Sequence, residues 1–225
     1  MLLPKLGIAY ALLPFKRNQD VIKIIEFGKG DYCIAVVDGW NKPDAFPDDK
    51  PGRDVAHIVA NEYPKLFLTY GKEANKKLEE RIAKKYPKYA SAVAAFLFHS
   101  STEDTIVSVG DVETYVWNGN EWYKPKQIGD HQLDRAHYPS NVSRFFGRGE
   151  LRDDPIYSSE PDVLSIARLT PVLIATDGIK DVLSVADINV IVGNLREPAK
   201  IIEKLIQEIQ KRRTQNDDIS ILIRS

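Results

Sequence analysis

Short runs of apolar residues divide the chain into segments, and their spacing predicts two kinds of element. Unbroken or alternating apolar runs bounded by Gly, Pro, Asn or Asp are typical of strands. Such runs occur at 5–13, 21–27, 33–38, 91–99, 105–109, 113–117, 121–123, 163–168, 172–175 and 219–224. Apolar residues three or four positions apart, or segments dominated by Lys and Glu, predict helices from Arg53 onward and over 72–86, 185–192 and 197–213. We expect Pro64 to kink or end the first helix.

The links between the segments predict how the strands pair. Gly110-Asp111 and Asn118-Gly119 each join two consecutive strands, and links this tight imply antiparallel neighbours. We expect the strands at 163–168 and 172–175 to form another such pair. Antiparallel strands interrupted by two pairs of helices predict an α+β fold, with the sheet in the middle and the helices outside. No composition shift marks a boundary, so we expect one domain over 1–225.

Charge and cysteine content then narrow the class of protein. The formal net charge of −1 argues against nucleic acid as a partner, because that binding needs a basic face. Cys33, the one cysteine of the chain, lies inside a predicted strand and is expected to be a small core residue. No leader pattern is present, and no run approaches the roughly 18 apolar residues of a membrane span. We therefore expect a soluble, cytoplasmic protein without a membrane partner.

Acidic residues recur where predicted strands end or begin. Asp38-Gly39 and Asp177-Gly178 each follow an apolar strand, Asp181 comes four residues after Asp177, and Asp217-Asp218 precedes the last strand. One isolated Asp-Gly pair is usually a plain turn. If the last strand is antiparallel to the other two, however, these carboxylates meet at one edge of one sheet. Clustered carboxylates repel one another, and a bound cation offsets that repulsion.

The order of the acidic signals resembles that of the metal-dependent protein phosphatases of the PPM type, also called type 2C. The resemblance spans nearly the whole chain. It rests on Asn18-Gln19-Asp20, Asp38-Gly39, the small-residue strand Ser91–Phe98, Gly110-Asp111-Val112-Glu113, Thr176-Asp177-Gly178-Ile179-Lys180-Asp181 and Asp217-Asp218-Ile219-Ser220.

This resemblance implies a central antiparallel β-sandwich flanked by pairs of helices, with two Mg²⁺ or Mn²⁺ ions at one end. By match, Asp38 bridges both ions, and the Gly39 carbonyl ligates the first. Asp177 and Asp217 hold the second ion, Asp20 acts through water, and Asp111 and Asp181 serve a weaker third ion. An all-oxygen ligand set selects hard cations, which activate water for in-line attack on a phosphate.

The implied activity is hydrolysis of phosphoserine and phosphothreonine in a protein substrate, opposing a Ser/Thr kinase, by a monomer. Phe15 stands where family members commonly carry the phosphate-binding Arg, so Arg17, or Lys16, is expected to take that role. Trp40 stands where the eukaryotic pattern offers a His. The alternative is a catalytically weak or inactive regulatory or scaffold module of the same fold. Retention of the metal-ligand acids favours the enzyme.

A pair of histidines is the other candidate for a metal site. His131 and His137 lie six residues apart, a spacing that does not place them on one helical face. We therefore expect loop histidines there and no zinc site.

Overall fold

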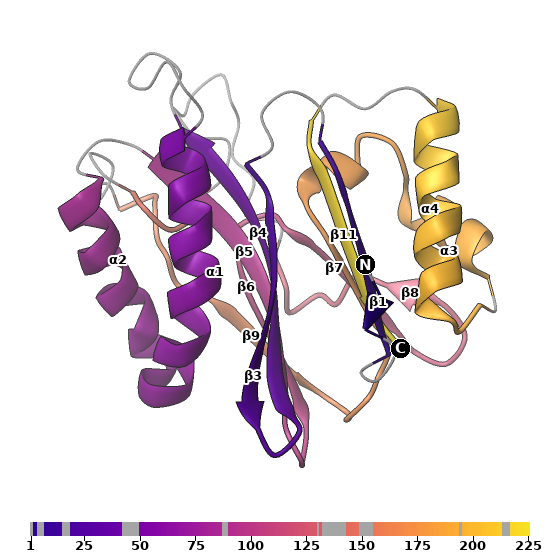
Figure 1. The fold of residues 1–225 in the computed structure, drawn as a ribbon, viewed down its shortest axis with the longest axis horizontal. Coiled ribbons are helices and arrows are strands. Elements are labelled where there is room, and N and C mark those ends of the chain that lie inside the picture. Colours follow the sequence, from indigo (N-terminus) through magenta and orange to yellow (C-terminus); the bar gives the residue numbers. More distant parts are fainter. Residues whose placement is uncertain are drawn as a thin grey trace.

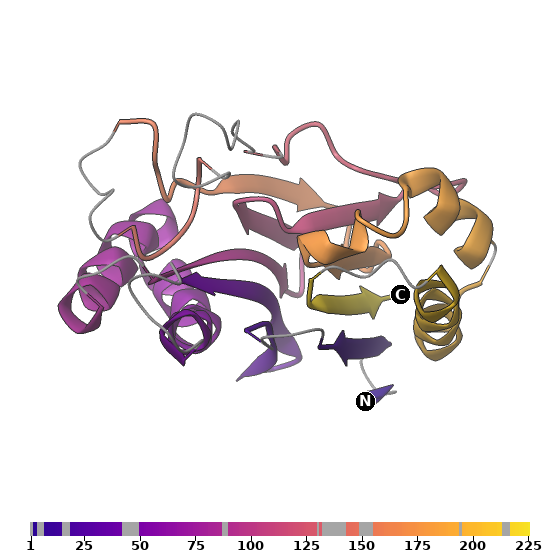
Figure 2. The same ribbon diagram turned by 90° about the horizontal axis from the view of Figure 1, so that it is seen from above.

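The protein is a sandwich of two antiparallel sheets with a pair of helices on each outer side (Figure 1; Figure 2). This arrangement comes from a computed structural model of the chain. The structure describes residues 2–3, 7–14, 19–41, 50–86, 90–129, 131, 143–148, 155–193, 195–212 and 217–225. The α+β fold class expected from the sequence is confirmed.

The two sheets contain strands from different parts of the chain. In the order of pairing, sheet A consists of β1 (Leu2–Leu3), β2 (Ile8–Leu13), β11 (Ile219–Arg224), β10 (Val172–Ala175), β7 (Glu113–Trp117) and β8 (Trp122–Tyr123). Sheet B consists of β3 (Val21–Gly28), β4 (Asp31–Asn41), β5 (Ala90–His99), β6 (Asp104–Val109) and β9 (Asp162–Ile166). All the pairings are antiparallel.

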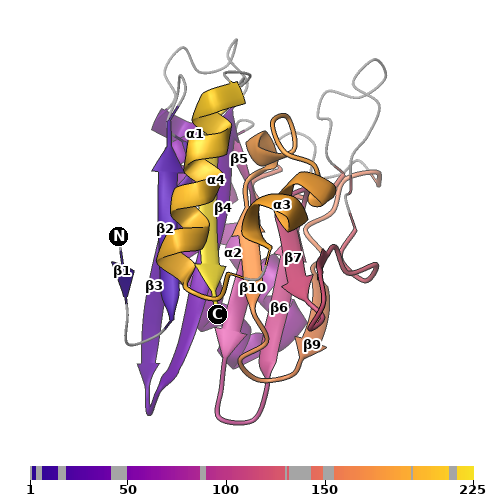
Figure 3. The ribbon, with the colours of Figure 1, turned by 90° about the vertical axis from the view of Figure 1, so that its right-hand side faces the viewer.

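The helices lie on the outer faces because each presents one apolar stripe. Helix α1 (Lys50–Tyr70), a short 3₁₀ turn η2 (Gly71–Glu73) and α2 (Ala74–Lys85) cover sheet B. Helices α3 (Val185–Val192) and α4 (Pro198–Arg212) cover sheet A (Figure 3). Ser184 caps α3 as expected: its hydroxyl accepts from the Asp187 amide, and the Asp187 carboxylate accepts from the Ser184 amide. No helix in the described ranges is long and apolar enough to cross a membrane.

Three apolar layers hold the four structural layers together. One layer lies between the sheets and includes Ile34, Leu97 and Leu222. The second lies between sheet B and its helices, and it contains the fully buried Cys33, as expected. The third lies between sheet A and its helices, and it contains the stripe of Ile201, Ile202, Leu205 and Ile209 from α4.

Two expected strand pairs are wrong. β6 pairs with β5 and β9 in sheet B, whereas β7 and β10 pair in sheet A. The short links after β6 and after β9 therefore carry the chain from one sheet to the other. Asp111 and Val112 in the first link are buried, and Val112 packs in the layer between the sheets. A hairpin turn would leave such residues at the surface, so a tight link alone does not identify a hairpin.

Helix α1 does not end at Pro64 but continues for six further residues to Tyr70. Proline removes one hydrogen bond from a helix interior. In α1 that loss is offset by packing, since eight residues of the helix, Pro64 included, are buried. Tertiary burial thus outweighs the local preference of the sequence.

Candidate active site

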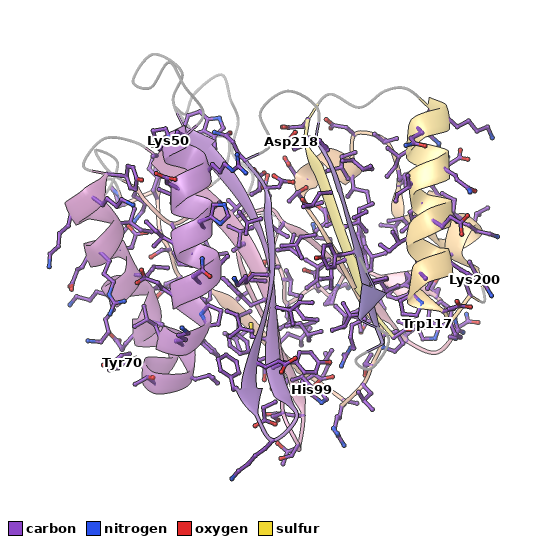
Figure 4. All side chains as sticks on the ribbon, in the orientation of Figure 1. Lys50, Tyr70, His99, Trp117, Lys200 and Asp218 are labelled. Atoms are coloured by element: carbon purple, nitrogen blue, oxygen red, sulfur yellow. The ribbon has the colours of Figure 1, made fainter. Side chains whose placement is uncertain are left out.

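The predicted acidic residues come together at one end of the sandwich. Asp38 lies near the end of β4, and Asp20 lies just before β3, its antiparallel neighbour. In sheet A, Asp177 follows β10, and Asp217-Asp218 precedes the antiparallel β11. Figure 4 shows Asp218 at this end, whereas His99 lies at the opposite end. The carboxylates come from both sheets, and the expectation that they lie along one edge of one sheet is wrong.

Mutual repulsion shows that the acids form one electrostatic group, here called the acidic end: Asp20, Asp38, Asp111, Asp177, Asp181, Asp217 and Asp218. Burial raises the pKa of Asp38 well above its usual value, and the Asp20, Asp177, Asp111 and Asp217 carboxylates raise it further. Burial raises the pKa of Asp177 to about 7; Asp111, Asp217 and Asp181 add to this rise, and Lys180 opposes it. Without added positive charge, this end of the molecule therefore resists full ionisation.

Two hydroxyl groups hold Asp20. The Thr176 and Ser220 hydroxyls donate to Asp20 Oδ2 over 2.9 and 2.7 Å, and the Ser220 amide donates to Thr176 Oγ1 over 2.9 Å. Burial nevertheless raises the pKa of Asp20 to about 6, with the Asp218 and Asp217 charges adding to it. Thr176 and Ser220 belong to the two motifs that supply Asp177 and Asp217, so the acidic motifs also carry the hydroxyls that orient Asp20.

The glycines after Asp38 and Asp177 allow close backbone approach. A Cβ on Gly39 would lie 2.5 Å from the Gly52 carbonyl oxygen in the first turn of α1. A Cβ on Gly178 would lie 2.4 Å from the Asp218 carbonyl oxygen. The space beside each glycine is therefore filled by backbone of this chain, and the second contact brings the β10 and β11 acids together.

The two adjacent acids before β11 differ in exposure. The Asp218 carboxylate is buried and accepts a hydrogen bond from the Gln19 amide over 3.1 Å. Asp217 is exposed, and its carboxylate accepts from the Asp218 amide over 2.8 Å. Asp218 thus ties the start of β11 to the segment before β3, and Asp217 stays accessible to solvent.

A lysine and a glutamate extend the acidic end on one side, and both were missed in the sequence. Lys180 Nζ lies 3.8 Å from Asp111 Oδ2 and 3.6 Å from Glu113 Oε1. Lys124 Nζ donates to Glu113 Oε1 over 3.1 Å, and the Tyr115 hydroxyl donates to Glu113 Oε2 over 3.1 Å. The signal was present, since Lys180 is the cation inside the Asp177–Asp181 motif.

The chemistry of these residues fits a hard divalent cation. The metal-binding atoms on offer are carboxylate and carbonyl oxygens, which hard cations prefer. The carboxylate charges repel one another in the metal-free protein. Among the described residues, no group of three or more His, Cys, Asp or Glu side chains could hold a metal ion as it stands. The phosphate-binding candidates Arg17 and Lys16, and His137, lie outside the described ranges. His131 Nε2 lies 2.7 Å from an oxygen of Asp162.

Comparison with known proteins gives a family match and a fold match. Residues 139–218 match the family model described as protein phosphatase 2C. A search of curated protein sequences found no match. Many solved structures share the fold, at sequence identities that show the fold alone.

Three of these structures indicate the extent of the likeness. A serine/threonine phosphatase from Staphylococcus aureus is 14% identical, with a TM-score of 0.73, covering 98% of this chain and 94% of that one. The PPM Ser-Thr phosphatase of Mycobacterium smegmatis, solved with cacodylate, is 16% identical, with a TM-score of 0.69 and 97% coverage of both chains. A sex-determining protein of C. elegans is 16% identical, with a TM-score of 0.73. That match covers 96% of this chain and 64% of the C. elegans chain.

The resemblance read from the acidic motifs is thus confirmed by an independent sequence match and by a fold match over nearly the whole chain. The chain thus has the fold of the PPM-type serine/threonine phosphatases, and its residues 139–218 match the sequence pattern of protein phosphatase 2C.

Proposed function

We propose that this chain is a metal-dependent protein phosphatase that hydrolyses phosphoserine and phosphothreonine. The observation that carries the proposal is the convergence of acids from both sheets on one end of a PPM-type sandwich. A phosphate dianion is repelled by this group of carboxylates unless cations intervene. The same group is therefore both a metal-binding site and, once loaded, a phosphate-binding site.

Asp38, the Gly39 carbonyl, Asp177 and Asp217 would hold two Mg²⁺ or Mn²⁺ ions, with Asp20 acting through water. When bound, such ions lower the pKa of water and screen the charge of a phosphate. Four other carboxylates raise the pKa of Asp38, so a cation bound there would offset the repulsion from all four. The prediction that Asp111 and Asp181 serve a weaker third ion is untested and is not part of this proposal, since Lys180 Nζ lies 3.8 Å from the Asp111 carboxylate.

Other side chains orient the metal-binding acids and bind the substrate. The Thr176 and Ser220 hydroxyls fix the Asp20 carboxylate, so its other oxygen keeps one direction. We propose that Arg17, or Lys16 in its place, binds the phosphate group of the substrate. Guanidinium is the better bidentate partner for phosphate oxygens, which favours Arg17.

The test is hydrolysis of a small aryl phosphate and a phosphothreonine peptide with Mn²⁺, with Mg²⁺ and with chelator. Wild type is compared with Asp177→Asn and with a surface control, Asp187→Asn, whose carboxylate pairs with Arg212 beside α3. We expect metal-dependent turnover that is lost in Asp177→Asn and kept in the control. Absence of turnover with either metal, from a protein shown to be folded, would exclude the enzyme.

A non-catalytic regulatory or scaffold module is the second candidate. It is favoured by Phe15 at the position where family members commonly carry the phosphate-binding Arg. This candidate predicts metal binding without turnover, so a metal titration run beside the hydrolysis assay separates the two functions.

We further propose that residues 1–225 act as one domain and that the chain works as a cytoplasmic monomer opposing a Ser/Thr kinase. The shared apolar layer between the sheets supports the single domain, because neither sheet buries its inner face without the other. Sedimentation of the purified chain tests the monomer.

A further inference from the structure

Lys180 directs its charge into the protein, although its side chain has access to solvent. The side chain is 27% exposed, yet its Nζ atom is buried. Lysine at a surface usually does the reverse: its carbon chain covers apolar atoms and its ammonium stays in water. An ammonium withdrawn from water requires compensation from nearby negative charge.

That compensation comes from two buried acids on the link and strand that enter sheet A. Asp111 and Glu113 are 3% and 4% exposed, and their carboxylates lie 3.8 and 3.6 Å from Lys180 Nζ. Lys124 is a second cation on Glu113. This side of the acidic end, the Asp111–Glu113 side, is thus provided with two positive charges by the chain itself.

The Asp38 side differs. Asp20 is held by the neutral hydroxyls of Thr176 and Ser220, and Asp218 accepts from a neutral backbone amide. Like charges surround Asp38. Among the described residues, the charges that act most strongly on Asp38 are thus negative, whereas the Asp111–Glu113 side already contains two cations.

We propose that Lys180 is a built-in counter-cation that takes the place of a divalent ion beside Asp111, so that the chain binds metal only on the Asp38 side. The inference rests on the proposed function in one respect: it assumes that divalent ions bind beside Asp38. An ammonium and a divalent ion cannot share the Asp111 carboxylate at close range without strong repulsion. Lys180 is thus a residue that limits the number of ions bound.

The first measurement is thermal unfolding in chelator. We expect Lys180→Met to lower the midpoint by about 2–4 °C, because two buried carboxylates lose their counter-charge. Lys180→Arg should restore most of the loss. In an Asp111→Asn/Glu113→Gln background, Lys180→Met should have little effect. The control is Lys200→Met, since Lys200 is an exposed lysine on α4 that pairs with Glu197 (Figure 4).

The second measurement counts bound Mn²⁺ by electron paramagnetic resonance of the free ion. We expect wild type and Asp111→Asn to bind the same number of ions, and Lys180→Met to bind one more. Adding Asp111→Asn to Lys180→Met should remove that extra ion. The inference is overturned if Asp111→Asn costs the wild type an ion, or if Lys180→Met gains none.

These outcomes separate the inference from the proposed function. An extra ion in Lys180→Met, from a chain without turnover, would support the counter-cation and exclude the phosphatase. Normal metal-dependent turnover, with no extra ion in Lys180→Met, would support the phosphatase and exclude the counter-cation.

Discussion

Both ends of the sandwich contain buried carboxylates, but the partners of these carboxylates differ between the two ends. At the end opposite the acidic group, Asp104 and Arg224 are fully buried, and Arg224 Nη1 donates to Asp104 Oδ2 over 2.7 Å. His99 Nδ1 lies 2.6 Å from the other oxygen of Asp104, and the Leu169 amide donates to Asp104 over 2.8 Å. Arg224 comes from sheet A, and Asp104 comes from sheet B, so this pair also joins the sheets.

At the acidic end, the principal charged neighbours of Asp38 are other carboxylates. A buried acid that is matched by cations and amides of its own chain serves the structure. A buried acid surrounded by other carboxylates lowers the stability of the metal-free protein. Such an acid indicates a binding or catalytic role. The comparison therefore separates structural acids from functional acids without reference to any relative.

Among the substitutions at the two ends, we expect Asp38→Asn to have the largest effect on turnover. We expect turnover to fall by roughly 10³-fold or more, because the residue central to the metal site is lost. Folding in chelator should be unharmed or improved, since one repelling charge is removed. Asp31→Asn, at the other end of the same strand β4, is the matched control and should retain turnover. Assays of hydrolysis and of unfolding on both variants check this, and equal turnover of the two would contradict it.

Arg224→Met makes the converse test at the opposite end. We expect a loss of about 3–5 kcal/mol in the free energy of unfolding, because the fully buried Asp104 loses the positive charge of its arginine partner. Metal affinity should stay unchanged. Urea unfolding measures the loss, and the double variant Asp104→Asn/Arg224→Met should recover most of it. An Arg224→Met protein as stable as wild type would show that the pair does not hold the sheets.

The elements were predictable from sequence where pattern and burial agree. The apolar run before Asp38 forms β4, the stripe after Pro198 forms α4, and Ser184 caps α3. The wrong predictions concern which elements meet. The link at Gly110-Asp111 has the length and composition of a hairpin, but β6 and β7 pair in different sheets and Val112 is buried between them.

The candidate site was predictable where it depends on local motifs and not where it depends on contacts between distant segments. Asp38 and Asp177 each stand in an Asp-Gly motif, and the order of these motifs along the chain made both residues predictable. The structure brings the two residues together. Lys180 was missed because a lysine in a turn looks exposed, and its direction depends on Asp111, which is distant in sequence. The hydroxyls of Thr176 and Ser220 were missed because their partner, Asp20, lies more than 150 positions away.

The pH dependence of the metal-free protein sharpens the comparison further. Burial and neighbouring acids raise the pKa of Asp20 to about 6 and that of Asp177 to about 7, from an ordinary value of 3.8. The folded state therefore holds more protons than the unfolded state between about pH 4 and pH 7. Its free energy of unfolding should fall across this window by several kcal/mol as pH rises, because each pKa unit corresponds to about 1.4 kcal/mol and both carboxylates contribute.

Urea unfolding in chelator at pH 4.5, 6 and 7.5 measures this fall. The same series with saturating Mn²⁺ should lose most of the dependence, because metal binding favours the ionised carboxylates. A metal-free protein that becomes more stable from pH 4.5 to pH 7.5 would contradict the electrostatic account of the acidic end.

The smallest expected effect concerns one hydroxyl at the acidic end. Ser220→Ala removes the 2.7 Å hydrogen bond to Asp20, which leaves Thr176 as its remaining hydroxyl donor. We expect turnover to fall by about 10-fold, the lower range for loss of a group that orients a metal ligand. The matched control is Ser108→Ala on β6, a buried serine for which the described residues offer no hydrogen-bond partner. That change should be neutral, because no bond is lost. Equal effects of the two substitutions on turnover would show that a buried serine matters here for its volume, and that the orientation of Asp20 does not limit the reaction.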